Sequence, residues 1–172
     1  RSLLETAVFM GKSEATRNAV TSGKPCDCGL PSCPVCTLFG AHKPPTECDP
    51  QLGPTRMLVR DACLTPEYAR LFREGRLPME IKNENIIHRV KGVAEHPRPL
   101  ERVPAGVCFV LNIALKVYEN DAPNLADWIF RGLRLVELDA LGGCSSRGCG
   151  QVAFEDMALN GSPVDMSAFS TF

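Results

Sequence analysis

The chain has 172 residues, which is enough for one domain with a hydrophobic core of its own. Its hydrophobic and charged fractions, 44% and 23%, are those of an ordinary globular protein, and no apolar run reaches the roughly 18 residues of a membrane span. The net charge of −1 excludes a protein that binds polyanions through bulk basicity, although charge can still be segregated along the chain. The chain starts at Arg1 with no signal-peptide pattern, so we expect a cytoplasmic protein and a piece of a longer one.

The first third of the sequence predicts one helix, one long insertion and one strand. Apolar residues within residues 1–10 (RSLLETAVFM) recur with the spacing of one helical face. Residues 11–54 form an irregular insertion rich in glycine and proline towards its end, and a loop of this length needs a staple to be ordered. Residues 55–64 (TRMLVRDACL) are typical of a strand.

The remaining sequence alternates extended and helical segments. Residues 80–106 carry alternating charges and suit an extended hairpin, and residues 107–118 alternate between apolar and polar with the period of a strand. Residues 125–136 place apolar side chains on one helical stripe, with Asp121 or Asn124 as the N-cap.

Glycines follow this predicted helix. Gly142 or Gly143 is expected to be its left-handed C-cap, and residues 151–157 (QVAFEDM) alternate like a closing strand. The order of elements, with a β-α-β ending, predicts an α+β domain of ferredoxin-like type.

Four of the nine cysteines crowd into the segment CDCGLPSCPVC, with the spacing C-x-C-x4-C-x2-C. Four thiolates at short spacing can close a tetrahedron around Zn²⁺, and such a site is usually structural. The absence of a secretory signal favours a metal over a disulfide framework. His42 or Cys48 could replace one thiolate, and the alternative is four unbound thiols in a loop. The predicted zinc ligands are Cys26, Cys28, Cys33 and Cys36.

The expected hairpin mixes cations with acids. Its charge pattern fits either a solvated surface that compensates its own charge, or a hairpin whose cations meet phosphates. The cations are Lys82, Arg89, Lys91, Arg98 and Arg102, and the acids are Glu80, Glu84, Glu95 and Glu101. Asp61, taken alone, reads as a capping or salt-bridge residue.

The segment LGGCSSRGCG, residues 141–150, resembles a phosphate-binding loop only in part. Gly143 and Gly148 have the G-x-x-x-x-G spacing, but Cys149 stands where a Walker lysine would be, and the segment follows a helix instead of a strand. Two interpretations remain open. One is a run of unhindered amides beside Arg147 that binds an anion or a sugar–phosphate backbone, and the other is a structural turn.

Taken together, these motifs resemble one family. The combinations E-N-x-I-x-R…P-R-x-x-E-R-V-x-A-G and L-G-G-x-x-x-R-G-x-G, with RSLLE, CPVCTLFG and RMLVRDACLT in the same order, cover most of residues 1–155. They are similar to the backbone RAMP subunit of type III CRISPR–Cas effector complexes. The nearest resemblance is to the Csm-type subunit, or to homologous domains of fused single-chain effectors.

The resemblance implies a single RAMP domain over residues 1–172, lacking the N-terminal part of its fold. The domain would have an RNA-recognition-motif-like fold, a zinc-binding insertion at 11–54 and a protruding β-hairpin thumb at about 83–102. Its partners would be crRNA, complementary target RNA, adjacent copies and other effector subunits, with no membrane. The residues implied in RNA contact are Arg1, Arg89, Lys91, Arg98, Arg102, Gly142, Gly143, Arg147 and Gly148.

The resemblance also implies a reaction. Members of the family cleave target RNA with Mg²⁺ or Mn²⁺, and the 2′-OH attacks the adjacent phosphate to leave a 2′,3′-cyclic phosphate. The catalytic aspartate would lie upstream of Arg1, so this segment alone is not expected to cleave. Acidic positions that match the family near the site are Asp61, Glu80, Glu84 and Glu101.

Three functions are compatible with the sequence. The first is a crRNA-binding backbone subunit that is an endoribonuclease when complete. The second is a non-catalytic subunit that scaffolds RNA in the same complex. The third is a zinc-stabilised protein-interaction domain without RNA affinity.

Overall fold

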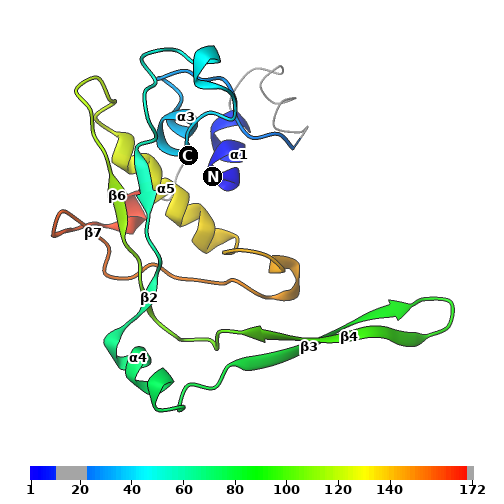
Figure 1. The fold of residues 1–172 in the computed structure, drawn as a ribbon. Coiled ribbons are helices and arrows are strands. Elements are labelled where there is room, and N and C mark those ends of the chain that lie inside the picture. The colour runs from blue at the N-terminus through cyan, green and yellow to red at the C-terminus, as the bar shows by residue number, and fades with distance from the viewer. Residues whose placement is uncertain (11–22, 170–172) are drawn as a thin grey trace. The chain divides into compact units, whose positions relative to one another are not determined.

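A computed structural model describes residues 1–10 and 23–169 of the chain (Figure 1). The predicted α+β class is confirmed, and the strands of these residues form four two-stranded sheets, β1–β6, β2–β5, β3–β4 and β7–β8. The elements in chain order are α1 (Ser2–Met10), α3 (Pro34–Phe39), η1 (Pro45–Glu47), β1 (Met57–Val59), β2 (Cys63–Leu64), α4 (Pro66–Arg73), β3 (Glu80–His88), β4 (Val93–Arg102), β5 (Phe109–Val110), β6 (Ile113–Leu115), α5 (Leu125–Leu138), η2 (Ser145–Arg147), β7 (Ala158–Leu159), β8 (Ser162–Pro163) and η3 (Met166–Phe169).

The chain divides into two compact units. The first unit combines Arg1–Leu58 with Ala114–Phe172, and the second unit is Val59–Ile113. A single domain over residues 1–172 stays a prediction, and parts of it, residues 11–22 of the insertion and 170–172, lie outside the described residues. No helix within the described ranges has both the length and the apolar character needed to cross a bilayer.

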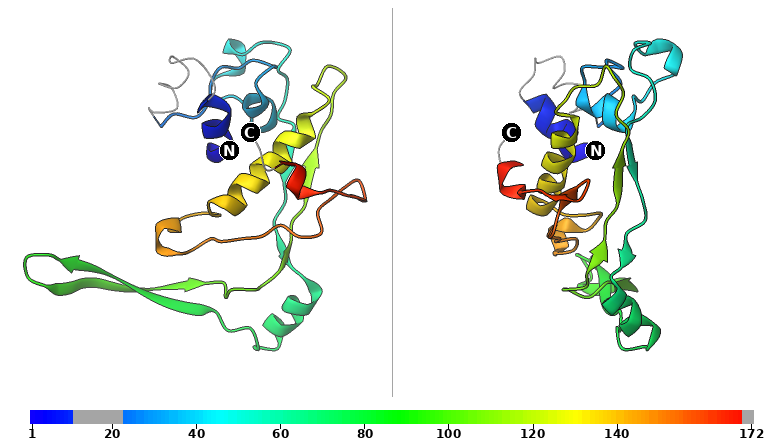
Figure 2. Two further views of the ribbon diagram at one scale, coloured as in Figure 1. Left: turned by 180° about the vertical axis from the view of Figure 1, so that it is seen from behind. Right: turned by 90° about the vertical axis from the view of Figure 1, so that its left-hand side faces the viewer.

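In the first unit, α5 contacts α1, α3 and η3 (Figure 2). The ring of Phe130 on α5 stacks on Phe169 of η3 with centroids 5.2 Å apart. α3 is short because Pro34 occupies its first turn and Gly40, with φ of +84°, ends it. The core residues, each at most 5% exposed, include Leu4, Val35, Leu38, Leu52 and Leu125.

A long antiparallel hairpin, β3–β4, dominates the second unit (Figure 1). Its register runs from Glu80 opposite Arg102 to His88 opposite Val93, with an irregularity between Glu84 and Ile86. The amide of Gly92 closes the turn on the carbonyl of His88 at 2.8 Å. β4 contains two prolines in the stretch EHPRPLER, and most side chains of the hairpin are exposed.

A second antiparallel pair, β2–β5, carries a helix that the sequence analysis did not predict. The amide of Thr65 continues the pair by donating to Cys108 O at 3.1 Å, and α4 begins directly after Thr65 with Pro66 in its first turn. The hydroxyl of Tyr68 on α4 donates to the carbonyl of Gly106 at 2.7 Å. No residue of α4 is buried, so the helix is not part of a core.

Two of the predicted strands are interrupted. Residues 55–64 give β1 and β2, separated by residues 60–62, and residues 107–118 give β5 and β6. Across the two interruptions, the amide of Arg60 donates to the carbonyl of Asn112 at 3.0 Å. The two segments therefore run alongside each other at this point without forming one continuous ladder of strand hydrogen bonds.

The end of α5 differs from the prediction. Asn124 is the N-cap residue as expected, but the helix ends at Leu138 with Asp139 as its C-cap, so the predicted glycine C-cap is wrong. The predicted closing strand at 151–157 is also wrong, and β7 begins after it. Apolar and polar residues alternate there because their side chains are alternately half-buried and exposed. The Phe154 amide donates to the Glu137 carboxylate at 2.6 Å and not to a neighbouring strand.

Candidate metal centre and nucleic-acid interface

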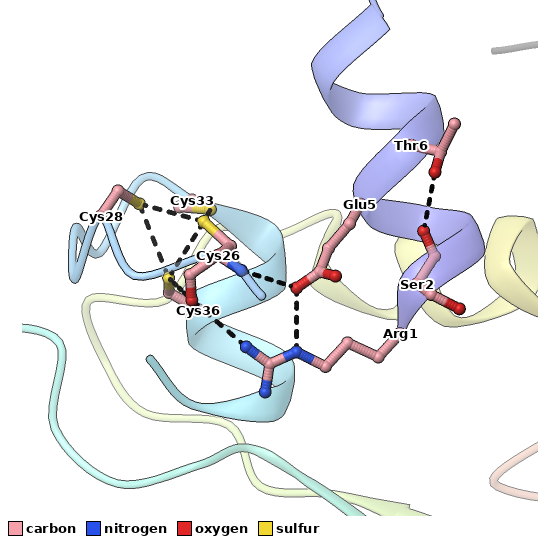
Figure 3. Close-up of polar contacts among 8 residues, drawn as sticks. All are labelled: Arg1, Ser2, Glu5, Thr6, Cys26, Cys28, Cys33 and Cys36. Atoms are coloured by element: carbon pink, nitrogen blue, oxygen red, sulfur yellow. Dashed lines mark hydrogen bonds and ion pairs between the residues drawn. The ribbon is translucent and has the colours of Figure 1, made fainter. Parts of the chain in front are cut away.

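The four clustered cysteines converge on one point in the first unit (Figure 3). Their sulfurs all lie within 4.8 Å of one another, and the distances from Cys26 Sγ to those of Cys28, Cys33 and Cys36 are 3.7, 3.9 and 3.6 Å. A Zn–S bond of about 2.3 Å gives an S···S separation of about 3.8 Å in a regular tetrahedron. The cluster therefore has the dimensions of a tetrathiolate site and could hold a metal ion such as zinc.

The local fold brings these thiols together without a disulfide. Cys33 is the N-cap residue of α3 and Cys36 lies in the helix, while Cys26 and Cys28 come from the preceding loop. This loop turns at Gly29, where φ is +65°, a conformation that glycine adopts more readily than other residues.

The alternative ligands lie apart from this cluster. Of the residues that the structure describes, only the four predicted cysteines form a group able to hold a metal ion. The Cys48 thiol contacts the carbonyl of Pro44 at 3.6 Å, and His42 is exposed.

The surroundings of the cluster shift the pKa of three thiols, those of Cys26, Cys28 and Cys36. Burial raises the pKa of Cys26 to about 12 and also raises the pKa of Cys36. Burial acts in the same direction on Cys28, but the amide of Leu30 and the neighbouring thiols lower its pKa overall. A divalent cation would stabilise all four thiolates together and release their protons.

The α1 helix contacts the start of the cysteine loop (Figure 3). Glu5 Oε1 accepts hydrogen bonds from the Cys26 amide and from Arg1 Nε, both at 2.9 Å, and Arg1 Nη2 donates to the Cys26 carbonyl at 3.2 Å. Sequence reasoning missed Glu5, because its partner lies 21 residues further along the chain. Arg1, expected to contact crRNA, is engaged in these contacts in this structure.

The predicted RNA-contacting cations of the second unit all belong to the hairpin. Arg89 and Lys91 lie exposed in its turn, beside Val90, which is 91% exposed. Arg98 pairs with Glu84 at 3.4 Å and Arg102 pairs with Glu80 at 2.7 Å, each across the two strands. The charges along the stem are therefore paired within the hairpin, and the contact of its cations with phosphates stays a prediction.

The acidic positions matched to the family are placed in two segments. Glu80, Glu84 and Glu101 lie on the hairpin, the first two in the ion pairs just described. Asp61 lies between β1 and β2 and is exposed. The carboxylates of Glu80 and Glu84 are therefore held by arginines in this structure.

The glycine loop, residues 141–150, is closed at its base and open at its tip. The Leu141 amide donates to the Gly150 carbonyl at 2.8 Å, and a Cβ on Gly150 would overlap the backbone of Leu141. An added Cβ on Gly142, Gly143 or Gly148 would meet no atom within 4 Å.

The expected run of unhindered amides is only partly present in this loop. The amides of Arg147, Gly148 and Cys149 donate to carbonyls within the loop, because residues 145–147 form the turn η2. The side chain of Arg147 is exposed at this turn. Arg147 and the glycines 142 and 143 therefore lie at the surface of the loop, whereas the amide of Gly148 donates to the Ser145 carbonyl.

The chain is similar to several known proteins. No protein-family model matches the chain. The chain is 35% identical over 166 residues to a protein of Methanothermobacter thermautotrophicus named CRISPR system Cms endoribonuclease Csm3, covering 88% of this chain and 65% of that protein. Proteins with the same name from Methanocaldococcus jannaschii and Streptococcus thermophilus are 35% identical over 161 and 123 residues. These two alignments cover 92% and 70% of this chain, and 60% and 53% of the relatives.

The chain spans 65% and 60% of the length of the first two relatives. The same name recurs in relatives from archaea and bacteria, at one level of identity over most of this chain. The resemblance drawn from the motifs is thereby confirmed. The chain belongs to the Csm3 family of backbone RAMP proteins of type III CRISPR systems.

Proposed function

We propose that the chain forms most of a crRNA-binding backbone subunit of a type III CRISPR effector, which holds the guide–target RNA duplex. The observation that carries this proposal is the exposed β3–β4 hairpin, with cations and apolar side chains at its turn, in a chain whose relatives are named CRISPR endoribonucleases. The hairpin would act as the thumb of an RNA-recognition-motif-like RAMP domain. Its partners would be crRNA, target RNA, adjacent copies of the subunit and other effector subunits.

The chemistry of the hairpin suits a nucleic-acid backbone. Arg89 and Lys91 can reach phosphates, while the exposed Val90 between them can lie against bases. The Arg102–Glu80 pair is exposed on both sides, and such pairs contribute at most about 1 kcal/mol, so Arg102 can exchange its carboxylate partner for a phosphate at little cost. Arg98 is also exposed, while its partner Glu84 is largely buried.

The glycine loop would make the second contact with the guide. Gly142 and Gly143 leave the backbone accessible, and Arg147 supplies a cation on the same turn. Sequence would then be read by base pairing, with the protein contacting the backbone and shape of the duplex.

The metal requirements would be of two kinds. Zinc in the tetrathiolate cluster would order the insertion and take no part in chemistry, because four thiolates leave no open coordination position. Mg²⁺ or Mn²⁺ would serve RNA cleavage in the complete protein, where a 2′,3′-cyclic phosphate is left. Asp61, Glu80, Glu84 and Glu101 would support that reaction, and the principal aspartate would come from sequence outside this chain.

A non-catalytic RNA scaffold is the second candidate function. It is favoured by the ion pairs of Glu80 and Glu84, because a carboxylate held by an arginine is a poor base. A cleavage assay on the full-length protein with guide and target RNA separates the two candidates, since only the first gives metal-dependent cuts.

RNA binding tests the shared part of the proposal. The double variant Arg89→Ala/Arg98→Ala is expected to weaken crRNA binding in fluorescence anisotropy and to reduce the slope of log K against log salt by about one for each cation removed. The reason is that fewer counterions are released when fewer cations meet phosphates.

The matched control removes two cations from α4 in the same unit, as Arg70→Ala/Arg73→Ala, and should leave crRNA affinity nearly unchanged. Equal affinity and equal salt dependence of the wild type and the hairpin variant would contradict the proposal. That result would favour the zinc-stabilised protein-interaction domain.

A further inference from the structure

We propose that Glu5 positions the first metal-ligating cysteine, so that metal binding and the docking of α1 are coupled through one carboxylate. This inference rests on the proposed metal site, whose four ligands are cysteines 26, 28, 33 and 36. Glu5 is on a different element from all of them, and it contacts no sulfur. Its role would be to hold the backbone of Cys26 from α1.

The carboxylate of Glu5 is nearly buried, and one of its oxygens makes this contact. The residue is 8% exposed, and its Oε1 accepts from the Cys26 amide and from Arg1 Nε, both at 2.9 Å. A buried carboxylate needs such partners because its desolvation is otherwise unfavourable. Leu4, the neighbouring residue on α1, packs in the core against α5, so α1 presents Glu5 from a packed helix.

Both polar groups of the Cys26 backbone are held at this point. Its amide donates to Glu5, and its carbonyl accepts from Arg1 Nη2 at 3.2 Å and from the amide of His42 at 3.2 Å. Cys26 is thus fixed on both sides of its Cα, which sets the direction of its Cα–Cβ bond and so limits the positions open to its Sγ. That sulfur lies 3.6–3.9 Å from the other three, so a shift of this backbone would open the tetrahedron.

Charge around the cluster supports the same arrangement. A divalent ion with four thiolates carries a net charge of about −2, to which an isolated carboxylate would add repulsion. Arg1 pairs with Glu5 at 2.9 Å and so compensates its charge, and Lys43 Nζ donates to the Cys28 carbonyl at 3.3 Å. Groups that hold metal ligands in place typically change metal affinity by about 10–100-fold when removed.

The test compares metal affinity between variants of the chain. Zn²⁺ affinity is measured by competition with a chromophoric chelator, and Co²⁺ replaces Zn²⁺ so that its absorption bands report four-sulfur coordination. Glu5→Ala is expected to lower the Zn²⁺ affinity by about 10–100-fold while keeping one metal per chain. Glu5→Gln, which retains an oxygen acceptor for Cys26 but loses the ion pair to Arg1, should lie between the wild type and Glu5→Ala.

Two controls separate this role from a general loss of stability. Thr6→Ala removes a hydroxyl that donates to Ser2 O on the same helix, and Glu137→Ala removes another largely buried carboxylate of the first unit. Both should bind Zn²⁺ as the wild type does. Wild-type affinity in Glu5→Ala, or an equal loss in Glu137→Ala, would overturn the proposal.

A second measurement needs no variant. In the wild type, removal of Zn²⁺ should speed hydrogen exchange in the peptide that contains α1, because Cys26 would no longer be fixed against Glu5. Unchanged exchange in α1 would overturn the coupling even if Glu5→Ala fails to fold. If the wild type binds no metal with four-sulfur coordination, the metal site itself is refuted, which is a different result from a metal site that is indifferent to Glu5.

Discussion

Arg56 is a charged residue that the fold almost completely removes from solvent. It is 5% exposed, and its Nε and Nη2 donate to both oxygens of Asp121 at 2.8–3.1 Å. Its Nη1 donates to the carbonyls of Leu52 and Pro54, and its guanidinium lies 4.5 Å from the centroid of the Tyr118 ring. The end of the insertion is thereby joined to the loop before α5 through one side chain.

The Arg56–Asp121 pair should be important for stability. Arg56→Ala leaves the buried carboxylate of Asp121 without its partner, so we expect a loss of about 3–5 kcal/mol in the free energy of unfolding by urea. Arg70→Ala is the control, because the Arg70–Glu74 pair is 64% and 43% exposed and should contribute less than about 1 kcal/mol. A similar small loss in both variants would contradict this role.

The same pair predicts a pH dependence. Hydrogen bonds from Arg56 lower the pKa of Asp121, burial opposes this, and the Tyr118 amide lowers it further. A carboxyl whose folded-state pKa lies below the unfolded value of about 3.9 stabilises the fold above that value, and this contribution is lost as pH falls through the folded pKa. Asp121→Asn should therefore flatten the loss of stability on acidification below about pH 4, as measured by urea unfolding at each pH.

At the scale of elements, the glycine loop depends on one glycine more than on the others. Gly150 has φ of +81°, and a Cβ there would overlap the backbone of Leu141, whereas an added Cβ on Gly143 meets open space. Gly150→Ala should destabilise the chain by about 1–3 kcal/mol, because it combines left-handed strain with a steric clash at the base of the loop. Gly143→Ala should leave the thermal midpoint nearly unchanged, and equal midpoints for the two variants would contradict the described geometry.

Some of these elements could be predicted from the sequence and others could not. The hairpin and α5 were predicted because strand pairing in one case and core packing in the other leave regular patterns along the chain. α4 was missed because it buries no residue, although Thr65 followed by Pro66 and Glu67 is typical of a helix start. The closing strand was wrong because alternating burial of Val152 and Phe154 does not require a neighbouring strand.

The candidate site was also predicted only in part. The four cysteines of the candidate metal site lie within eleven residues, so their spacing alone predicted the cluster. Glu5 and Asp121 were not assigned their roles, because their partners are 21 and 65 residues away and such pairings leave no local pattern. Short-range chemistry was therefore readable from the sequence, and long-range hydrogen bonding required the structure.

At the scale of the whole molecule, the candidate metal site and the core of the first unit share α3. Val35 and Leu38 are fully buried core residues of the same short helix that contains Cys36 and follows Cys33. Loss of the metal would therefore loosen the packing against α5 as well as the insertion. The metal is expected to act on the stability of the first unit and not only on one loop.

Metal removal tests this expectation. A chelator should lower the Tm of the chain, and Zn²⁺ at about 1,000 times its Kd should restore about 4 kcal/mol by mass action. Cys33→Ser should have a low Tm with or without Zn²⁺, while Cys144→Ser, in the glycine loop, should respond like the wild type. A Tm that does not respond to the chelator would show that the thiols do not need a metal for folding.

The two prolines of β4 have a consequence for how the protein behaves at high concentration. A two-stranded ribbon leaves an outer edge on each strand, and an exposed edge can template the strand of another molecule. Pro97 and Pro99 lack amide hydrogens, and prolines in sheets normally have that missing donor on the outer side. The β4 edge is therefore protected against polymerisation between molecules, so that apolar side chains such as Ile86 and Ile87 can remain exposed without driving aggregation through that edge.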